Sequence, residues 1–467
     1  MQMYHRKDGQ EQPYWPAGPF KIRLPFVHYR WEVAEMIQAL IMFVVSLAMI
    51  PLLETYLGIP YDVALAYVVI CGIGFMLPAL LGVPLVPGWI TPGIPVVLLF
   101  LSDYQPGPEA IQALFALQFL VFLIFLILGL TGLGAKLVQL IPRSMKGGII
   151  IGAGIAALTG EIQAGGRLAE TPISLILGGL VCLYLMFSVS FKGLLDRNII
   201  ARKIANYGMV PGMVVAILVG FATGEYDVPN VQWGITQPAF GELWNYLPFS
   251  VGFPDASIFL YAIPTAVIAY VIAFGDIIVG KSLMDRVDHL RRDEDIDASI
   301  DRVHLVTAIR NGMHSFFAPY PGLAGPIWTA VTATMAERYK YGRKAMDSIY
   351  SGGGTFWITG FVALFALPLV SFFQPVLPIA LSLTLLLTGY ICLMVGLEQL
   401  ENNTERGIAG TMGVVLAVYG AGWGLATGAL LYILIERTRI LGFTSDPEAP
   451  GARQQPAPDT GTESVSK

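Results

Sequence analysis

The chain has 467 residues, of which 55% are hydrophobic and 13% are charged, and its mean hydropathy is +0.64. This composition excludes an ordinary soluble globular protein and predicts a polytopic membrane protein. The formal net charge of -5 gives no basic surface for a nucleic acid. The three cysteines, Cys71, Cys182 and Cys392, are isolated inside apolar segments, so we expect neither a disulfide framework nor a metal site.

The apolar segments have the length of membrane spans. A helix needs about 20 apolar residues to cross the hydrocarbon core, and this length divides the chain into about fourteen segments. They are expected near residues 33–53, 61–81, 84–101, 110–132, 140–159, 171–190, 208–222, 257–280, 303–317, 324–336, 348–370, 376–396, 406–421 and 423–436. We therefore predict an all-α polytopic membrane protein with about fourteen transmembrane segments in a 7+7 inverted repeat with core and gate domains.

The basic loops set the predicted orientation. Lysine and arginine gather in alternate loops, including 192–203 and 281–302, whereas the loop 225–256 contains neither. Because basic loops stay in the cytoplasm, we expect a multi-pass inner-membrane protein with both termini cytoplasmic.

The segments also give predicted domain boundaries. We divide the chain into a cytoplasmic N-terminal segment (1–30), a first inverted repeat (31–222), an extracytoplasmic loop (223–256), a second inverted repeat (257–440) and a cytoplasmic tail (441–467). The tail is rich in Pro, Gly and Ser and is expected to be disordered.

The third and tenth segments cannot be continuous helices. Residues 318–330 contain Pro319, Pro321 and Pro326, and residues 82–95 are equally rich in Pro and Gly. Paired breaks at corresponding positions of two halves mark the substrate site of a transporter built from inverted repeats. Helices that begin inside a membrane direct unpaired amides and a positive dipole end into the cavity, where they attract an anionic or electron-rich group.

Eight residues near the breaks are therefore predicted to line the substrate site: Thr91, Pro92, Gly93, Tyr320, Gly325, Pro326, Trp328 and Thr329. The aromatic rings can stack on a solute and the threonines can donate hydroxyl groups. The alternative is that these are packing and capping groups.

Asp276 is a carboxylate inside an apolar segment. Placing a carboxylate inside a membrane costs free energy, so a residue of this kind is expected to have a function. We predict that Asp276 couples transport to H⁺ or Na⁺. The alternative is that Asp276 lies near the cytoplasmic end, pairs with Lys281 and merely ends the helix.

Several motifs occur in the order of a known family. They are Leu140-Ile-Pro-Arg-Ser-Met-Lys-Gly-Gly, Met209-Val-Pro-Gly-Met, Ile272-Ala-Phe-Gly-Asp276, Arg310-Asn-Gly-Met313 and Gly396-Leu-Glu-Gln-Leu400. The chain resembles the nucleobase–ascorbate transporters, that is the xanthine and uracil permeases, and more distantly the sulfate permeases that share their fold. The resemblance implies a homodimer through the gate domain, against which the core moves.

Two departures from the nucleobase permeases concern their substrate-binding carboxylates. The glutamate that the family carries one turn before the Gly-Asp element is replaced by Ile272, and the glutamate that follows a glycine in the tenth segment is replaced by Pro326. Nucleobase transport and anion transport thus remain two branches, with a slight preference for an anionic organic or inorganic solute.

The sequence as a whole predicts a secondary-active transporter, or permease, that moves a small polar or anionic solute by symport with H⁺ or Na⁺ and needs no other cofactor. The alternatives are a sulfate permease-like transporter or exchanger of inorganic or organic anions and, second, an uncoupled channel-like protein. No paired catalytic constellation is present, so an enzyme is not expected.

Overall fold

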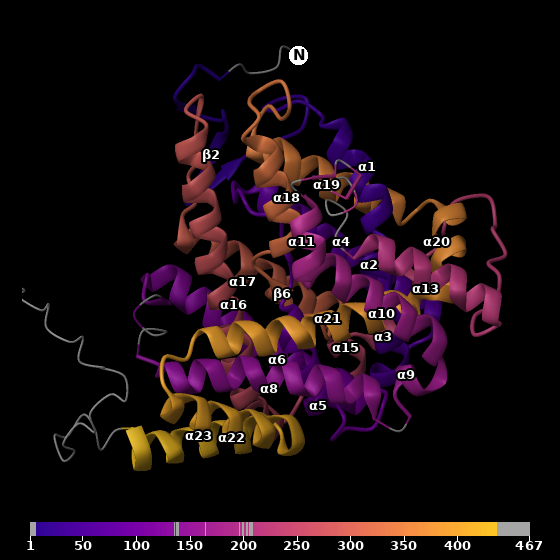
Figure 1. Cartoon of the computed structure of the whole chain (residues 1–467), viewed down its shortest axis with the longest axis vertical. Coiled ribbons are helices and arrows are strands. Elements are labelled where there is room, and N and C mark those ends of the chain that lie inside the picture. The colour runs from indigo at the N-terminus through magenta and orange to yellow at the C-terminus, as the bar shows by residue number, and fades with distance from the viewer. Residues whose placement is uncertain are drawn as a thin grey trace, which may run out of the picture.

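The computed structural model describes residues 6–436, apart from 135, 137–139, 164, 196, 199, 202–203 and 205–208. The predicted tail (441–467) lies outside the described residues. The described chain is mostly helical, with the elements arranged as in Figure 1.

The first half contains α1 (Val33–Met42), α2 (Val44–Leu47), α3 (Ile50–Leu57), α4 (Tyr61–Leu80), η1 (Thr91–Gly93), α5 (Ile94–Leu101), α6 (Pro108–Thr131), α8 (Arg143–Ile162), α9 (Arg167–Glu170), α10 (Pro172–Phe187), α11 (Val189–Leu195) and α13 (Val210–Thr223). The second half contains α14 (Phe240–Leu243), η2 (Trp244–Tyr246), α15 (Pro248–Val251), α16 (Ala256–Leu290), α17 (Ile300–Phe317), α18 (Thr329–Tyr339), α19 (Ile349–Ala363), α20 (Leu367–Phe373), η3 (Gln374–Val376), α21 (Leu377–Glu398), α22 (Asn403–Tyr419), α23 (Ala421–Leu431) and the π-helix η4 (Tyr432–Glu436). Short strands are β1 (Gln10–Glu11), β2 (Trp15–Ala17), β3 (Phe20–Ile22), β4 (Gly88–Trp89), β5 (Glu294–Asp295) and β6 (Ala324–Gly325).

Among the described residues, six helical stretches are long and apolar enough to cross a membrane. They are Val33–Leu57, Tyr61–Leu80, Pro108–Thr131, Arg143–Glu170, Ala256–Leu290 and Leu367–Glu398. Shorter apolar helices lie at Thr91–Leu101, Pro172–Phe187, Val210–Thr223 and Ala421–Glu436. The observed helices fall where the apolar segments were expected, while the count of about fourteen crossings remains a prediction.

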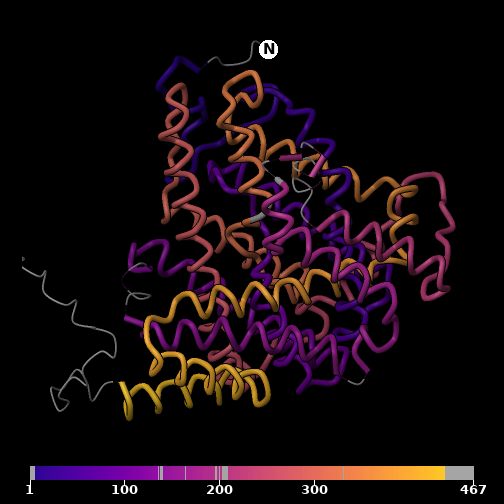
Figure 2. Tube along the Cα trace, in the orientation of Figure 1, coloured from indigo at the N-terminus to yellow at the C-terminus, as the bar shows by residue number. Residues whose placement is uncertain are grey.

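The helices form two packed groups, each drawn from both halves of the chain. In one group, α4 and α6 pack with α16, α17 and α19, and α18 packs on α16 and α19. In the other, α8, α10 and α13 pack with α21, and α22 and α23 pack on α8. The trace in Figure 2 shows the C-terminal helices running beside α8. These groups are the core and gate domains of the predicted fold.

Glycines bring the gate helices close together. A Cβ atom on Gly148 would meet Met412 Sδ at 2.7 Å, and one on Gly154 would meet the carbonyl oxygen of Gly389 at 2.9 Å. The glycine run of α8 is therefore a packing surface against α21 and α22, as small residues often are between membrane helices.

The N-terminal segment is folded onto one end of the core group. Strand β1 pairs in parallel with β5, which lies between α16 and α17. The buried Arg6 guanidinium donates hydrogen bonds to the Asp293 carboxylate and to the Asp347 carbonyl oxygen, both at 2.9 Å. The same guanidinium lies 3.5 Å from the Glu294 carboxylate. Residues 6–30 thus join the turn after α16 to the turn before α19.

Neutralising Asp293 is expected to lower the thermal stability of the protein. Burial opposes ionisation of this carboxyl, but the hydrogen bond and charge of Arg291, followed by those of Arg6, hold its pKa at about 2. The unfolded value is about 3.9. The carboxylate therefore contributes stability that is fully present above about pH 4 and is lost as the pH falls toward 2.

The variant Asp293→Asn should accordingly unfold a few degrees below the wild-type protein at pH 7, and the difference should shrink between pH 4 and pH 2. Thermal unfolding in detergent at several pH values measures it. The exposed neighbour Asp295 serves as the control, because Asp295→Asn should leave the unfolding midpoint unchanged. Equal midpoints for Asp293→Asn and wild type at pH 7 would show that the cluster does not stabilise the fold.

Candidate substrate-binding site

The two predicted breaks meet each other in space. Strands β4 and β6 pair antiparallel, with Gly88 opposite Gly325 and Trp89 opposite Ala324. Backbone groups that leave a helix inside a membrane need partners, and here each strand supplies them to the other. The expectation that the third and tenth segments are interrupted is confirmed.

A half-helix follows each strand. The chain continues from β4 through η1 into α5, and from β6 into α18, which begins at Thr329. Neither helix start has a side-chain cap: Ile90, Gly93 and Trp328 stand at the N-cap positions of η1, α5 and α18 without a capping hydrogen bond. The start of α18 therefore offers amides and a positive dipole end to a solute. At the start of η1 and α5, Pro92 and Pro95 have no amide, and the amides of Gly93 and Ile94 bond to the carbonyl oxygens of Ile90 and Thr91, so this end offers chiefly its dipole.

Two side chains behind the strands hold the junction. The Asn311 side chain on α17 accepts a hydrogen bond from the Ala324 amide and donates one to the Ala324 carbonyl oxygen, both at 2.9 Å. The Gln118 side chain on α6 donates a hydrogen bond to the Asn311 side chain at 3.3 Å and accepts one from the Tyr320 amide at 2.8 Å. The junction is thereby fastened to two continuous helices of the core group.

Arg310 joins both strands at once. It is fully buried, and its guanidinium donates to the carbonyl oxygens of Gly325 at 2.5 Å and Gly88 at 3.0 Å. The guanidinium carbon also lies 5.1 Å from the centroid of the Phe75 ring. No carboxylate of the described residues lies within ion-pair distance of Arg310, so its positive charge is not neutralised locally.

Gly325 is required by the close approach of the strands. A Cβ atom at this position would lie 2.5 Å from the carbonyl carbon and oxygen of Trp89 and 2.7 Å from the Ile90 nitrogen. The variant Gly325→Ala is expected to force the strands apart, lower the unfolding midpoint and reduce transport at least about tenfold. Gly353→Ala is the control, because the nearest atom to its Cβ lies 3.9 Å away. Wild-type stability and transport in Gly325→Ala would contradict the observed strand pairing.

Helix α16 faces both half-helices. It packs against η1, α5 and α18, and it also touches α8 of the gate group. Gly280 shows which side of α16 faces the half-helices. A Cβ atom added at Gly280 would lie 2.9 Å from Leu85 and 3.1 Å from Ile327, the residues that precede the two helix starts. Asp276 is one turn before Gly280 on the same side of α16. The predicted coupling residue is therefore on the side of α16 that faces the junction.

The surroundings of Asp276 exclude the alternative that it ends the helix. Helix α16 runs to Leu290, well beyond Asp276, and Lys281 pairs with Asp285 at 2.8 Å. Asp276 is half-buried and makes no hydrogen bond or ion pair with a described residue. It lies within electrostatic reach of Cys392 on α21, so it is close to the boundary between core and gate.

The structure separates the predicted site residues into three positions. Thr91 and Pro92 are half-buried at the start of η1, with Gly93 buried behind them, while Trp328 is half-buried and Thr329 exposed at the start of α18. Gly325 and Pro326 are buried within and just after β6.

Tyr320 is fully buried. Its hydroxyl lies 3.4 Å from the Ser46 carbonyl oxygen, and its ring lies 6.0 Å from that of Trp89. The helix starts therefore keep partly accessible residues, whereas Tyr320 is packed in the core.

Arg310, Asn311 and Gln118 are functional candidates that sequence reasoning did not single out. The Arg310-Asn pair was noted only as a family motif. The available signal was an arginine within an apolar segment, which by itself indicates a functional or tightly satisfied charge.

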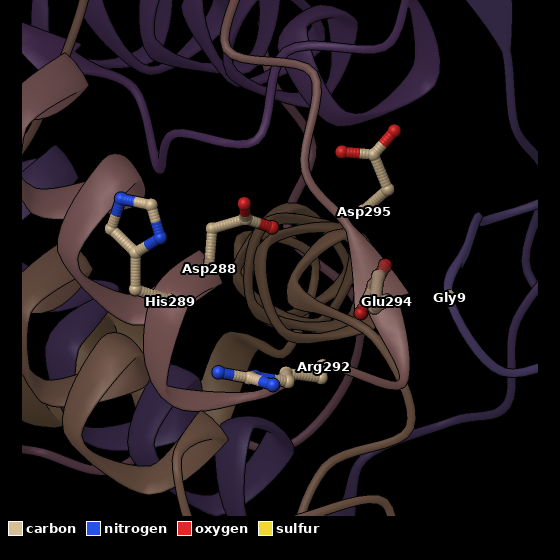
Figure 3. Close-up of a pocket in the computed structure, with 6 residues that line it drawn as sticks. All are labelled: Gly9, Asp288, His289, Arg292, Glu294 and Asp295. Carbon is tan, nitrogen blue, oxygen red and sulfur yellow. The ribbon is translucent and has the colours of Figure 1, made fainter.

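The hollow shown in Figure 3 lies away from the junction. It has a volume of about 370 Å³ and is lined by Gly9, Asp288, His289, Arg292, Glu294 and Asp295. These residues come from the end of α16, the turn that follows it and the N-terminal segment. Among the described residues, no group of three or more His, Cys, Asp or Glu side chains is arranged to hold a metal ion.

A fold of core and gate groups, with two half-helices meeting at an antiparallel strand pair, defines a membrane transporter. A family model described as the Permease family, named for xanthine and uracil permeases, matches residues 32–294. This is more than half of the chain, and the protein belongs to that family. No curated protein sequence gives a significant match.

Two solved structures share the fold. The transmembrane domain of the cyanobacterium bicarbonate transporter BicA aligns with a TM-score of 0.53 at 17% sequence identity, over 85% of this chain and 96% of that chain. The structure of SLC26A9 aligns with a TM-score of 0.50 at 13% identity, over 87% of this chain and 65% of that one. At these identities the likeness concerns the fold alone.

Proposed function

We propose that the protein is a secondary-active transporter that binds a small anion at the junction of β4 and β6 and moves it by alternating access. The observation that carries this proposal is the buried Arg310 charge behind the two strands, next to two uncapped helix N-termini. Three sources of positive potential converge at one place, and no carboxylate of the described residues lies within ion-pair distance of Arg310. A site of this kind favours a negatively charged solute.

The missing carboxylates support the same solute class. A nucleobase permease site uses two glutamates, and Ile272 and Pro326 stand at those positions here. The structural neighbour BicA is a bicarbonate transporter, which fits a small inorganic or organic anion as the solute. The second candidate is a nucleobase, favoured by the family match, which would have to be recognised by Trp328 and backbone amides.

We propose that Asp276 binds the coupling H⁺ or Na⁺. It is an unpaired carboxylate on the side of α16 that faces both half-helices, and it lies near the gate helix α21. Bringing a cation to this carboxylate would offset its repulsion of an anionic solute, which couples the two binding events. Alternating access follows if the core group, with the junction, moves against α8 and α21. The proposed protein forms a dimer through the gate group. Both of its termini lie in the cytoplasm.

Uptake by the purified protein in liposomes tests the proposal. Labelled sulfate, bicarbonate, a small carboxylate, uracil and xanthine would each be offered with an inward H⁺ gradient, an inward Na⁺ gradient or no gradient. The proposal expects accumulation of an anion that depends on one of the gradients. Accumulation of uracil or xanthine alone would favour the second candidate, and anion flux that ignores both gradients would reject coupling.

A further inference from the structure

A narrow apolar groove lies on the outer side of the core group. It has a volume of about 280 Å³ and is formed by α1, α19 and the start of α20. Leu40 and Val362 line it and are 38% and 61% exposed, and Ala366 also lines it. The lining of the groove is mostly apolar, as binding of an acyl chain requires.

One end of the groove carries an exposed aromatic pair. Trp31 lines the groove, and its ring is stacked on that of Phe26 with centroids 5.5 Å apart and an interplanar angle of 9°. Phe26 is 64% exposed and has a left-handed φ of 63°, which a non-glycine residue rarely adopts. Exposed aromatic rings at the end of an apolar helix are typical of the membrane–water interface, and backbone strain of this kind concentrates at functional positions.

Two basic side chains lie at the same end, and one of them, Arg30, forms an ion pair with Glu32, with 3.1 Å between Arg30 Nε and Glu32 Oε1. The Arg30 side chain is 39% exposed, and its Nη2 donates to the Lys344 carbonyl oxygen at 3.0 Å, which places the exposed Lys344 beside it. The facing carboxylate of Glu32 is 2% exposed. It already accepts hydrogen bonds from the Ser351 hydroxyl at 2.9 Å and from the Asp347 amide at 2.8 Å. Arg30 Nη1 makes no hydrogen bond with a described residue, so it can donate to an external acceptor.

A third feature lies between the charges and the apolar end. The Thr355 hydroxyl accepts a hydrogen bond from the Glu32 amide at 3.2 Å. Thr359 follows one helical turn, about 6 Å, further along α19. Thr359 lines the groove and is 7% exposed, and its hydroxyl oxygen is buried and has no hydrogen-bond partner among the described residues. A buried hydroxyl without a partner is costly, and a ligand acceptor would satisfy it.

We propose that this groove is a binding site for an anionic phospholipid. The phosphate interacts with Arg30 and Lys344, the aromatic pair packs at the headgroup level, the Thr359 hydroxyl donates to an ester carbonyl and an acyl chain lies along Leu40 and Val362. The order of basic, aromatic, hydroxyl and apolar groups follows the order of groups in such a lipid. Both α1 and α19 belong to the core group, so the lipid would travel with the core.

Native mass spectrometry of the full chain with added phosphatidylglycerol or phosphatidylcholine tests the proposal. Phosphatidylglycerol should bind more tightly than phosphatidylcholine. Leu40→Trp should fill the groove and abolish the bound species, while Ile41→Trp, a neighbour that is 37% exposed but outside the groove, should keep it. Lys344→Gln should weaken phosphatidylglycerol binding about fivefold, the effect of one basic residue near an anionic surface, whereas Lys192→Gln, at an exposed lysine on α11, should not.

Equal binding of the two lipids, or equal loss in Leu40→Trp and Ile41→Trp, would overturn the proposal. A shift from dimer to monomer in Leu40→Trp would also overturn it, because a second copy of the chain would then be the occupant. Thermal unfolding of each variant without lipid separates loss of the site from loss of folding. Lipid binding is measured without solute uptake, so the result tests the lipid site independently of the proposed transport function.

Discussion

Arg310→Gln is expected to weaken binding of the transported anion by about 30-fold. A unit charge about 8 Å from the solute contributes about 2 kcal/mol at an effective dielectric constant of about 20, which corresponds to that factor in affinity. The glutamine can still donate one hydrogen bond to a strand carbonyl, so part of the junction is retained. The measurement is the KM for anion uptake in proteoliposomes, together with the unfolding midpoint.

Two further variants separate charge from structure. Arg310→Lys keeps the charge but cannot bridge the Gly88 and Gly325 carbonyl oxygens with a planar fork, so it should retain more anion affinity than Arg310→Gln while losing stability. Arg302→Gln is the matched control on the same helix, because Arg302 binds the Pro19 and Gly82 carbonyl oxygens and Asp297 instead of the junction. An unchanged KM in Arg310→Gln would remove this charge from solute recognition.

Asp276→Asn is expected to abolish gradient-driven accumulation and to leave exchange of solute across the membrane. The amide has nearly the shape of the carboxylate but cannot take up a proton or present a negative charge to Na⁺. Since Asp276 makes no hydrogen bond or ion pair with described residues, the substitution removes no interaction that supports the fold.

Uptake and counterflow assays on the same preparation distinguish these two activities. Asp285→Asn is the control on the same helix, because Asp285 is exposed and pairs only with Lys281. Unchanged accumulation in Asp276→Asn would exclude this residue from coupling, and loss of both accumulation and exchange would show that it serves binding instead.

The broken helices could be predicted because their cause is local. Proline lacks an amide and glycine disfavours helix, so Pro319, Pro326 and Gly325 mark a break without reference to the rest of the chain. The positions of the apolar helices were predictable for the same reason. That the two strands pair is a tertiary fact, but the correspondence between the two halves indicated that the breaks would meet.

The supports of the junction could not be predicted in this way. Gln118 and Asn311 are 193 positions apart in sequence, and Arg6 and Asp293 are 287 positions apart. No local pattern connects such residues, so neither the hydrogen-bonded core behind the strands nor the folded N-terminal segment was foreseen. The role of Tyr320 as a lining residue stays a prediction; the structure places its buried ring 6.0 Å from that of Trp89.

The length of α16 resolves what local reasoning left open about Asp276. The sequence allowed a helix that stopped near Asp276 with Lys281 as its partner. Helix α16 instead continues to Leu290, and Lys281 forms its ion pair one turn onward with Asp285. A charge every few residues, as in this stretch, is compatible with a continuing helix because i,i+4 pairs stabilise it.

The most direct test of an anion site at the junction is a thermal-unfolding screen of the purified wild-type protein. Nucleobases, sulfate, bicarbonate, small carboxylates and sulfonates would be added one at a time at pH 6 and pH 8, since a ligand that binds the folded state raises the unfolding midpoint. We expect stabilisation by at least one small anion, and a smaller effect of the same anion on Arg310→Gln. Stabilisation by uracil or xanthine with none by any anion would contradict the anion site.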